Sequence, residues 1–505
     1  MIVEIGATLT IADVVAVATQ AARVTVATGS RAAVAASRAL VDRLVAAGTP
    51  VYGITTGVGR FASVRISPAD TATLQLNIVR SHAAGVGAPL PIDVVRAMML
   101  LRAHGLALGY SGVRQEVIDL LAACLNHGIH PLVPEQGSVG ASGDLAPLAH
   151  LALALIGEGE VMVDGRRQPA SGALTAAGLT PVRLGAKEGV ALVNGTQLMT
   201  GIGALSLHRA ARCCLAADVA GAMTLETLRG RSGAFHPRLH QARPHPGQQA
   251  AASNILRMTE GSTLIDSAPD RVQDAYSLRC LPQVHGAVKD AVAQAVAVVQ
   301  VEINAATDNP LLFPDGDLVL SGGNFHGQPV ALALDYLAVA MAGLGVMVER
   351  RVERLLNPSL SGLPAFLARD GGLHAGLMLA QYTAAALASE NKILAHPASV
   401  DSIPTSANQE DHVSMGASAA RKAAQVVENL EQLVAIETLC AAQALEFHTG
   451  ERVGRGTAAA YRAVRDVIPA LVDDRVLAPD LAAAASLVRG GGVLDGVESE
   501  IGALQ

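Results

Sequence analysis

The sequence predicts a mostly α-helical protein. Half of its 505 residues are apolar, but only 2% are aromatic and none is Trp, so Ala, Leu and Val must supply the core. This composition, with little β-branched alternation, favours helices. Three stretches of helical periodicity are longer than the mean helix of about 11–12 residues: 284–307, 328–356 and 415–446. Because small apolar residues occupy more than one face of each stretch, we expect helices buried on most sides in a bundle.

The N-terminal part is expected to alternate helices with glycine-rich loops. Thr10 is expected to cap the first helix, and residues 51–63, which contain three glycines, predict a mobile loop. Asp144 is expected to cap a helix that follows a glycine-rich turn. A Gly-, Asp- and Arg-rich section at 157–169 predicts a short hairpin. The helical patterns of this part are two within 1–50, then 70–83, 93–125 and 145–156.

The C-terminal part is expected to hold the long helices. Residues 189–228 predict one or two buried helices. Residues 230–249 are rich in Arg, His and Pro and predict a surface connection. The more polar segment after Thr449 predicts a separate helical layer.

Composition excludes several classes of function. A formal net charge of −7 leaves no basic stripe for nucleic acid and no polybasic patch for a membrane surface. Five scattered cysteines and no secretory signal indicate a reduced, cytoplasmic protein. Residues 189–207 are uncharged over a membrane-spanning length but contain several polar side chains, and the apolar run 336–348 is too short to span. We therefore expect buried helices and no membrane span.

Two further patterns predict no site of their own. The Gly-x-Gly patterns at 57–59 and 201–203 lack the preceding strand and following helix that a dinucleotide-binding fold needs. His236 and His240 stand four residues apart, a spacing that suits a metal ion on a helix, but Pro237 lies between them and predicts a surface loop. We expect no metal site.

One segment permits unusual chemistry. Residues 137–150, with the sequence GSVGASGDLAPLAH, begin with three glycines and two serines in seven positions. Because Gly143 has no side chain, its backbone nitrogen can be pressed against the carbonyl carbon of Ala141. Closing that bond and losing two waters would turn Ser142 into the methylidene of a methylidene-imidazolone, an electrophile that no ordinary side chain provides. An isolated Ala-Ser-Gly, in contrast, predicts only a glycine-rich turn.

The whole of this segment resembles the signature of the histidine and phenylalanine ammonia-lyase family, and the resemblance extends from Leu9 to the end of the chain. It implies a mostly α, ammonia-lyase/fumarase-like fold. The N-terminal domain, 1–200, would carry a lid loop and the prosthetic group. The C-terminal domain, 201–505, would hold the central bundle of long helices and a C-terminal helical layer.

The resemblance also implies the cofactor and the assembly. A 4-methylidene-imidazol-5-one group would form from Ala141, Ser142 and Gly143, so that no metal and no dissociable cofactor is needed. Family members are homotetramers in which each active site is built from three subunits. Nearly all-apolar helices agree with this assembly, because a lone monomer would leave large apolar patches exposed.

Three N-terminal motifs imply functional residues. YGITTG, which begins at Tyr52, resembles the lid loop whose tyrosine is the catalytic base that removes the β-proton. SHAAGVG matches the histidine-lyase version of a selectivity segment and implies that His82 faces the substrate imidazole. EGVALVNGTQ matches the segment whose asparagine, here Asn194, contacts the prosthetic group and the amino acid.

Three further motifs imply the rest of the pocket. QDAYSLRC places Arg279 on the substrate carboxylate, since a planar two-donor guanidinium suits a carboxylate best. The same motif places Tyr276 close to the electrophile as a catalytic residue and Gln273 in the pocket. GGNFHG supplies Phe325, and GLMLA supplies Met378.

The motif SANQEDHVSM carries the substrate prediction. Histidine lyases resemble it with Glu at the position of Glu410. A carboxylate can accept a hydrogen bond from an imidazole N–H and would gain nothing from a phenyl ring. We therefore expect non-oxidative deamination of L-histidine to trans-urocanate and ammonia.

Some positions depart from the histidine type. Histidine lyases generally have Phe where this chain has Val58, while Thr55, Ala275 and the pair Gly327-Gln328 resemble the tyrosine lyase and aminomutase branch. The alternatives are therefore a tyrosine or phenylalanine ammonia-lyase and an aromatic 2,3-aminomutase. A non-enzymatic structural tetramer would keep the tripeptide uncyclised.

Overall fold

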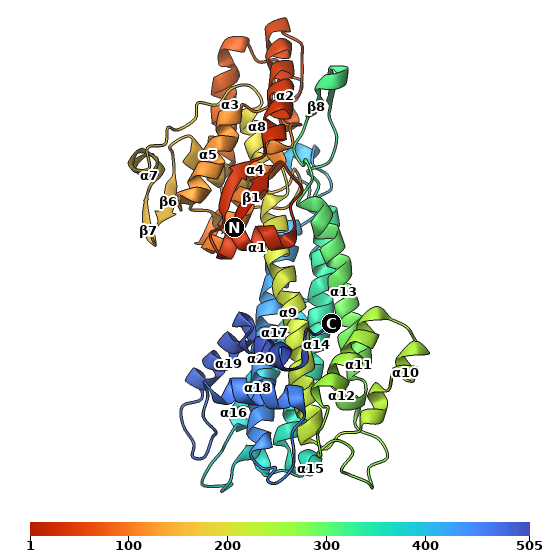
Figure 1. Cartoon of the computed structure of the whole chain (residues 1–505). Coiled ribbons are helices and arrows are strands. Elements are labelled where there is room, and N and C mark those ends of the chain that lie inside the picture. Colours follow the sequence, from red (N-terminus) through yellow and green to blue (C-terminus); the bar gives the residue numbers. More distant parts are fainter. The chain divides into compact units, whose positions relative to one another are not determined.

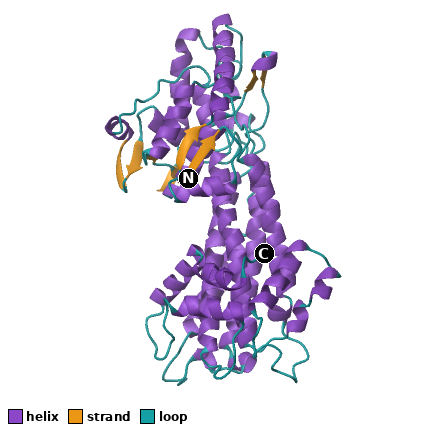
Figure 2. Cartoon of the chain, in the orientation of Figure 1, coloured by secondary structure: helices purple, strands orange, loops and turns teal.

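The protein is mostly helical, as the sequence predicts. The computed structural model describes all residues, 1–505. Helices dominate, and the strands are few and short (Figure 2). The chain divides into two compact units: the first contains 1–208, 296–335 and 397–421, and the second contains 209–295, 336–396 and 422–505. The division between 1–200 and 201–505 stays a prediction.

Four long helices contribute residues to both units: α9 (Gln197–Thr227), α13 (Leu281–Glu302), α14 (Gln328–Leu356) and α17 (Gly416–Leu445). The last three correspond to the three long stretches that the sequence predicts. The predicted helical region 189–228 forms α8 (Glu188–Val193) and α9. They are separated at Gly195, whose φ of +152° favours glycine.

The first unit holds the shorter N-terminal elements. Its other helices are α1 (Ile11–Thr19), α2 (Thr28–Ala47), α3 (Thr71–His82), α4 (Ile92–Ala107), α5 (Gln115–Asn126), α6 (Leu145–Leu155) and α7 (Ala170–Ala176). Its 3-10 helices are η1 (Gly59–Phe61), η2 (Pro68–Asp70), η4 (Pro314–Gly316) and η6 (Ser406–Asn408).

The strands of this unit form small sheets. The parallel pair is β1 (Ile2–Ile5) with β2 (Arg23–Val26). The antiparallel groups are β3 (Val86–Pro89) with β5 (Pro134–Gln136), then β4 (His130–Pro131) with β6 (Glu160–Val163) and β7 (Arg166–Pro169), and β8 (Leu311–Phe313) with β9 (Leu318–Leu320). The β6–β7 pair confirms the hairpin predicted at 157–169.

Two local predictions can be compared directly at the N-terminal end. Thr10 caps α1, as predicted, through a reciprocal pair of hydrogen bonds with Asp13. The helix predicted over 93–125 is instead two helices, α4 and α5. They are separated by Gly109 and Gly112, which have φ values of +85° and +67°. A Cβ on Gly109 would lie 2.5 Å from Cβ of Ala33, so the chain turns where only glycine fits.

Asp144 occupies the N-cap position of α6, as predicted, but its side chain makes no capping hydrogen bond to that helix. Its Oδ2 accepts from the backbone N–H groups of Leu198 and Met199, each at 3.0 Å, in the first turn of α9. Its Oδ1 accepts from the Ser138 hydroxyl at 2.8 Å. Burial raises the pKa of Asp144 to about 6, although these hydrogen bonds oppose the shift. A fully buried carboxylate needs several donors, and α9 and Ser138 supply them here.

The second unit is helical. Its other helices are α10 (Pro237–Gln241), α11 (Pro246–Met258), α12 (Tyr276–Arg279), α15 (Pro358–Ser361), α16 (Met378–Leu394), α18 (Arg455–Arg465), α19 (Ala478–Gly490) and α20 (Gly492–Ile501), with the 3-10 helices η3 (Ser232–Phe235) and η5 (Ala365–Leu367). The prediction of a surface connection at 230–249 is confirmed, since most of these residues are exposed, although the segment also forms η3, α10 and the start of α11. Pro237 and Pro246 stand at helix starts, where a missing N–H is tolerated.

Buried polar groups join the long helices within the second unit, where α9, α13, α14 and α17 lie side by side (Figure 1). Arg351 of α14 forms a two-bond ion pair with Glu437 of α17, at 2.5 and 2.8 Å. The same guanidinium contacts His285 of α13 at 3.1 Å, and His285 contacts Asp218 of α9 at 2.8 Å. Since all four side chains are almost fully buried, removing one partner would leave an unpaired charge.

Helix α14 is long and apolar enough to cross a membrane by length and composition alone. However, 61% of its most apolar 18-residue stretch is buried inside the protein. Core helices of globular proteins can be equally long and apolar, so this helix is weak evidence for a membrane span.

Buried His104 on α4 makes the stability of the first unit depend on pH. Its Nδ1 accepts from the backbone N–H of Gly6 at 3.1 Å, and its Nε2 has no partner. Burial lowers the pKa of His104 from 6.5 to about 4. The unfolded chain therefore binds the proton more readily than the folded chain. Stability is fully present above pH 6.5 and falls by about 3 kcal/mol, for this one group, as the pH drops to about 4.

We expect His104→Gln to flatten this acid-induced loss, because Gln keeps an acceptor for Gly6 and takes up no proton. The measurement is the midpoint of urea denaturation between pH 7 and 4.5. The exposed His245 gives the control His245→Gln, which should behave like the parent chain. An unchanged pH dependence in His104→Gln would contradict the prediction.

Candidate active site

The glycine-rich segment forms a tight loop that is closed against a second loop. Gly143 has a φ of +73°, and a Cβ there would lie 2.1 Å from the carbonyl oxygen of Gly195. The backbone N–H of Asp144 donates to the same oxygen at 2.6 Å. Only glycine fits at position 143, so the loops 137–144 and 194–196 are held against each other.

Ser142 makes hydrogen bonds with two of the predicted site residues. Its hydroxyl donates to Oε1 of Glu410 at 2.8 Å, and its carbonyl accepts from Nδ2 of Asn194 at 2.7 Å. The other carboxylate oxygen of Glu410 accepts from Oγ1 of Thr405 at 2.7 Å. Two predicted site residues from distant parts of the sequence thus contact Ser142 directly.

The loop that carries Glu410 is held in a strained shape. Thr405 and Glu410 exchange backbone hydrogen bonds of 2.9 and 3.3 Å. Between them, Ser406, Ala407 and Asn408 have φ values of +52°, +52° and +66°. Each such residue costs about 1–3 kcal/mol and persists only where its surroundings enforce it. The direction of the Glu410 carboxylate is therefore fixed by the backbone as well as by the Thr405 side chain.

The segment that follows Glu410 packs on the glycine-rich loop. The backbone N–H of Met415 donates to the carbonyl of Val139 at 2.9 Å, and the Ser414 hydroxyl donates to the carbonyl of Gly140 at 3.0 Å. Ala141 forms a small buried apolar cluster with Val413 and Met415. The motif SANQEDHVSM and the signature segment therefore make one continuous wall of the site.

His82 ends α3, with its Nδ1 3.1 Å from the hydroxyl of Ser81. Burial lowers the pKa of His82 below its ordinary value, while a hydrogen bond with the carbonyl of Ile78 and the negative charge of Glu410 oppose the shift. The imidazole is therefore neutral at neutral pH, and one of its nitrogens can accept a hydrogen bond.

The residues after His82 lie beside the signature segment. Strand β3 pairs with β5, which ends directly before Gly137. A Cβ on Gly137 would lie 3.1 Å from Cα of Gly85, and Gly85 donates its N–H to Nε2 of His150 at 3.1 Å. The selectivity segment and the signature segment are thus in contact at both ends of the signature.

Tyr52 is fixed in its own loop. Its hydroxyl oxygen accepts from the backbone N–H of Gly59 at 3.0 Å. Gln75 anchors this loop, because its Nε2 donates to the carbonyl of Gly53 and its Oε1 accepts from the N–H of Val190, each at 3.2 Å. The lid loop is therefore tied to α8, the helix that leads to the asparagine beside Ser142.

Two further contacts join the lid loop and the Phe325 segment to the residues around Glu410. A Cβ on Gly59 would lie 2.8 Å from Oγ of Ser406. Phe325 is half-buried, and its neighbour His326 contacts the carbonyl of His412 at 3.3 Å and stacks on the His412 ring. These contacts place both segments against the same loop.

The other predicted site residues belong to the second unit. There, Arg279 donates to Oε1 of Gln273, and its guanidinium lies 4.6 Å from the centre of the Tyr276 ring. Nε of Arg279 is buried without a partner, and Tyr276 is 69% exposed. Met378 is the half-buried first residue of α16. Gln273, Tyr276 and Arg279 form one cluster that can present a cation and a phenol to a carboxylate.

Sequence reasoning missed two residues that position the predicted ones. Thr405 holds the carboxylate of Glu410, and its place directly before SANQEDHVSM was the available signal. Gln75 holds the lid loop from inside an ordinary helix, where the sequence gives no signal because its partners lie far along the chain.

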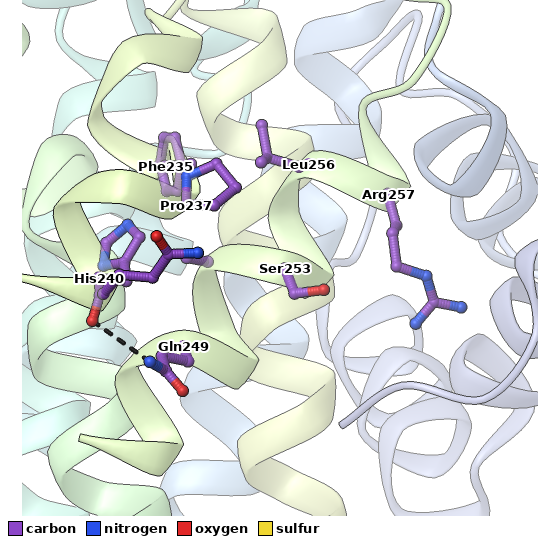
Figure 3. Close-up of a pocket in the computed structure, with 9 residues that line it drawn as sticks. Phe235, Pro237, His240, Gln249, Ser253, Leu256 and Arg257 are labelled. Atoms are coloured by element: carbon purple, nitrogen blue, oxygen red, sulfur yellow. Dashed lines mark hydrogen bonds between the residues drawn. The ribbon is translucent and has the colours of Figure 1, made fainter. Parts of the chain in front are cut away.

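A pocket of about 440 Å³ beside α10 and α11 contains none of the predicted site residues (Figure 3). Three of its polar lining side chains already have structural partners. Gln249 donates to the carbonyl of His240 at 3.4 Å, and Arg257 donates to the carbonyl of Ala503 at 2.8 Å. The imidazole of His240 contacts the carbonyl of Ala234 at 3.2 Å. The signature segment, and not this pocket, is the candidate active site.

A profile of aromatic amino acid lyases matches residues 9–466, which is most of the chain. The chain belongs to the aromatic amino acid lyase family. This finding confirms the family and the enzyme class that the sequence predicts, a carbon–nitrogen lyase. Enzymes of this family use a methylidene-imidazolone group.

Similar proteins within the aromatic amino acid lyase family match the whole chain. The histidine ammonia-lyase of Symbiobacterium thermophilum is 58% identical over 504 residues, covering 100% of this chain and 99% of that protein. The crystal structure of histidine ammonia-lyase from Trypanosoma cruzi has a TM-score of 0.93 and 43% identity, covering 99% of this chain and 96% of that one. Tyrosine aminomutase from Streptomyces globisporus has a TM-score of 0.95 and 40% identity, with 100% of both chains covered. The predicted fold class is therefore confirmed.

Proposed function

We propose that this lyase deaminates L-histidine non-oxidatively to trans-urocanate and ammonia. The observation that carries the proposal is the contact between the Ser142 hydroxyl and Oε1 of Glu410. It puts a carboxylate, which suits an imidazole N–H, beside the residue from which the electrophile would form. The full-length similarity to proteins named histidine ammonia-lyase supports the same substrate.

We also propose that Ala141, Ser142 and Gly143 cyclise to the methylidene-imidazolone group. The residues fit it, because position 143 admits only glycine and Asn194 already binds the carbonyl of Ser142. When formed, the group supplies an electrophilic carbon to which an amine can add. The remaining chemistry belongs to ordinary side chains.

Glu410 and His82 would hold the imidazole end of the substrate. Thr405 occupies one oxygen of Glu410, and the Ser142 hydroxyl occupies the other only until cyclisation removes that hydroxyl. In the mature chain, Oε1 is therefore directed by its neighbours and open to an imidazole N–H. His82, neutral at neutral pH, can make the second hydrogen bond to the ring.

Arg279 and Asn194 would hold the carboxylate end, and Gln273, Phe325 and Met378 would line the pocket. Tyr276 would orient the amine. With both ends held, the β-carbon is fixed beside Tyr52, which removes the β-proton. Such positioning is a large part of the rate enhancement of many enzymes.

We further propose a cytoplasmic homotetramer whose active sites are each shared between subunits. An apolar stripe along α14 supports self-association: Leu332, Tyr336, Val339, Gly343 and Val346 recur at alternating spacings of four and three residues. The four larger side chains of this stripe are 46–54% exposed. Such a stripe fits a helix of a second copy. The five cysteines are free thiols, which agrees with a reducing compartment.

An aromatic aminomutase or a tyrosine or phenylalanine lyase is the second candidate. Thr55, Ala275 and Gln328 favour it, as does the similarity in fold to a tyrosine aminomutase. The deciding experiment incubates the chain with histidine, tyrosine and phenylalanine side by side and identifies the products. Urocanate from histidine supports the proposal. A cinnamate or β-amino acid from tyrosine or phenylalanine, without urocanate, would refute it.

We expect Glu410→Gln to lower histidine turnover by about 10–100-fold, since a charge-assisted hydrogen bond contributes about 1.5–3 kcal/mol. The measurement is kcat/KM for histidine, with intact mass showing that cyclisation is complete. The neighbouring exposed carboxylate gives the control Asp411→Asn, which should match the parent. A near-normal rate in Glu410→Gln would remove the basis for the substrate assignment.

A further inference from the structure

Arg102 is a buried cation that lies behind the candidate active site. It belongs to α4 and is 0% exposed. Its Nη1 donates to the backbone carbonyl of Asn194 at 2.6 Å. Its Nε and Nη2 are buried without a partner. A buried guanidinium that makes only one hydrogen bond lowers the stability of the folded chain. Its presence here therefore suggests a role other than stability.

The hydrogen bond from Arg102 reaches the turn that closes on the tripeptide. Gly195 follows Asn194, and a Cβ there would lie 2.7 Å from Nη1 of Arg102. The opposite side of this turn faces the signature segment. The Asn194 side chain donates to the carbonyl of Ser142, and the Gly195 carbonyl accepts from the N–H of Asp144. These two hydrogen bonds, which we call the two anchors, involve the residues on either side of Gly143, whose nitrogen must move in cyclisation.

No acid neutralises Arg102 by direct contact. Asp308, whose negative charge acts on Arg102, is hydrogen-bonded to Lys187 at 2.6 Å and to Ser111 at 2.9 Å. Burial lowers the pKa of Arg102 to about 10, with Asp308 opposing the shift. The side chain therefore keeps its charge at neutral pH, and the turn at 194–195 is its sole hydrogen-bonded partner.

We propose that Arg102 is a positioning residue for the self-cyclisation of the tripeptide, acting through the turn at Asn194 and Gly195. The inference rests on the proposed function, in which Ala141, Ser142 and Gly143 form the prosthetic group. Arg102 fixes the Asn194 carbonyl on one side of the turn. The two anchors on the other side then stay directed at Ser142 and Asp144. Gly143 is then held close to the carbonyl carbon of Ala141.

The reaction that Arg102 assists is a cyclisation with loss of two waters and no change of oxidation state. The Gly143 nitrogen bonds to the carbonyl carbon of Ala141. The first water takes the Ala141 oxygen with the amide protons of Gly143 and Ser142, leaving a double bond from that carbon to the Ser142 nitrogen. The second water takes the Ser142 hydroxyl with the Ser142 Cα proton. Arg102 touches none of these atoms and acts only by placement.

The test follows the mass of the full-length chain over time after synthesis, since each cyclised chain is lighter by two waters. Met matches the stem of Arg as far as Nε but has neither charge nor donor. We expect Arg102→Met to cyclise about tenfold more slowly or worse, as loss of a charged hydrogen bond predicts. Its melting temperature should not fall, because the variant removes a poorly paired buried charge. Slower cyclisation without lower stability separates positioning from a merely structural role.

Arg96 gives a matched control on the same helix. It is 6% exposed and donates to the carbonyl of Val17 at 2.8 Å and to that of Leu125 at 3.2 Å. These partners lie outside the site loops, so Arg96→Met should lose stability and still cyclise at the parent rate. Arg102→Lys keeps the cation and one donor on a shorter side chain, and we expect partial rescue of the rate.

The outcomes are distinct. A parent chain that never loses two waters would overturn the proposed function and this inference with it. A cyclising parent together with an Arg102→Met variant that matures at the parent rate would overturn this inference alone. If Arg102→Met does not fold, Arg102→Lys decides: a rate equal to that of the parent overturns the role of the guanidinium, and a slower rate in folded protein supports it.

Discussion

Ser142→Ala is expected to leave the chain at its unmodified mass and to lower turnover of every substrate by about 10⁴-fold or more, which corresponds to about 5.5 kcal/mol of transition-state stabilisation. Alanine has no hydroxyl to lose, so no methylidene carbon can form. The hydrogen bond to Oε1 of Glu410 disappears as well, but this contact belongs to the uncyclised chain. Intact mass and product formation from histidine are the two measurements.

Ser232→Ala is the matched control for this variant. Ser232 makes the same type of bond, from its hydroxyl to Oδ2 of Asp266 at 2.6 Å, but lies outside the candidate active site. It should therefore still lose two waters and retain activity. A Ser142→Ala chain that keeps parent-like turnover would show that the chemistry does not start from this serine.

Tyr52→Phe is expected to lower kcat by about 10³-fold for every substrate, within the range usual for removal of a general base. The phenyl ring preserves the packing of the lid loop, and only the contact between the hydroxyl and the Gly59 N–H is lost. Cyclisation should be complete, because Tyr52 takes no part in it. Steady-state rates and intact mass together test the assignment.

Tyr110→Phe serves as its control. Tyr110 packs on Phe313 with ring centres 5.5 Å apart, and the variant removes the same hydroxyl outside the predicted site. Its rate should equal that of the parent. If Tyr52→Phe also equals the parent, another group removes the β-proton and the role given to the lid loop is wrong.

The sequence could predict elements whose pattern is local. The long helices α13, α14 and α17 follow from apolar periodicity over many residues, and the Thr10 cap follows from neighbours three residues apart. Asp144 shows the limit, because its carboxylate ends on α9, more than fifty residues along the chain. The interruption of the predicted helix 93–125 likewise depends on the close approach of Ala33 to Gly109, which no local pattern contains.

The site could be predicted as a set of residues but not as an arrangement. Motifs marked Ser142, Asn194 and Glu410, yet only folding shows that one serine contacts both of the others. Gln75 and Arg102 act through contacts with residues far along the chain. A glutamine in an ordinary helix and an arginine in an apolar helix have no distinctive sequence context, so their roles depend on three-dimensional neighbours.

The contact between Ser142 and Glu410 also bears on the order of events in a newly made chain. If Glu410 binds the substrate imidazole as proposed, an uncyclised chain, in which the Ser142 hydroxyl occupies Oε1 of Glu410, would have little capacity to bind histidine. The proposed cyclisation would remove that hydroxyl in the same reaction that creates the electrophile. Affinity for the substrate and the ability to transform it would thus arise together, and unfinished chains would not accumulate as unproductive complexes.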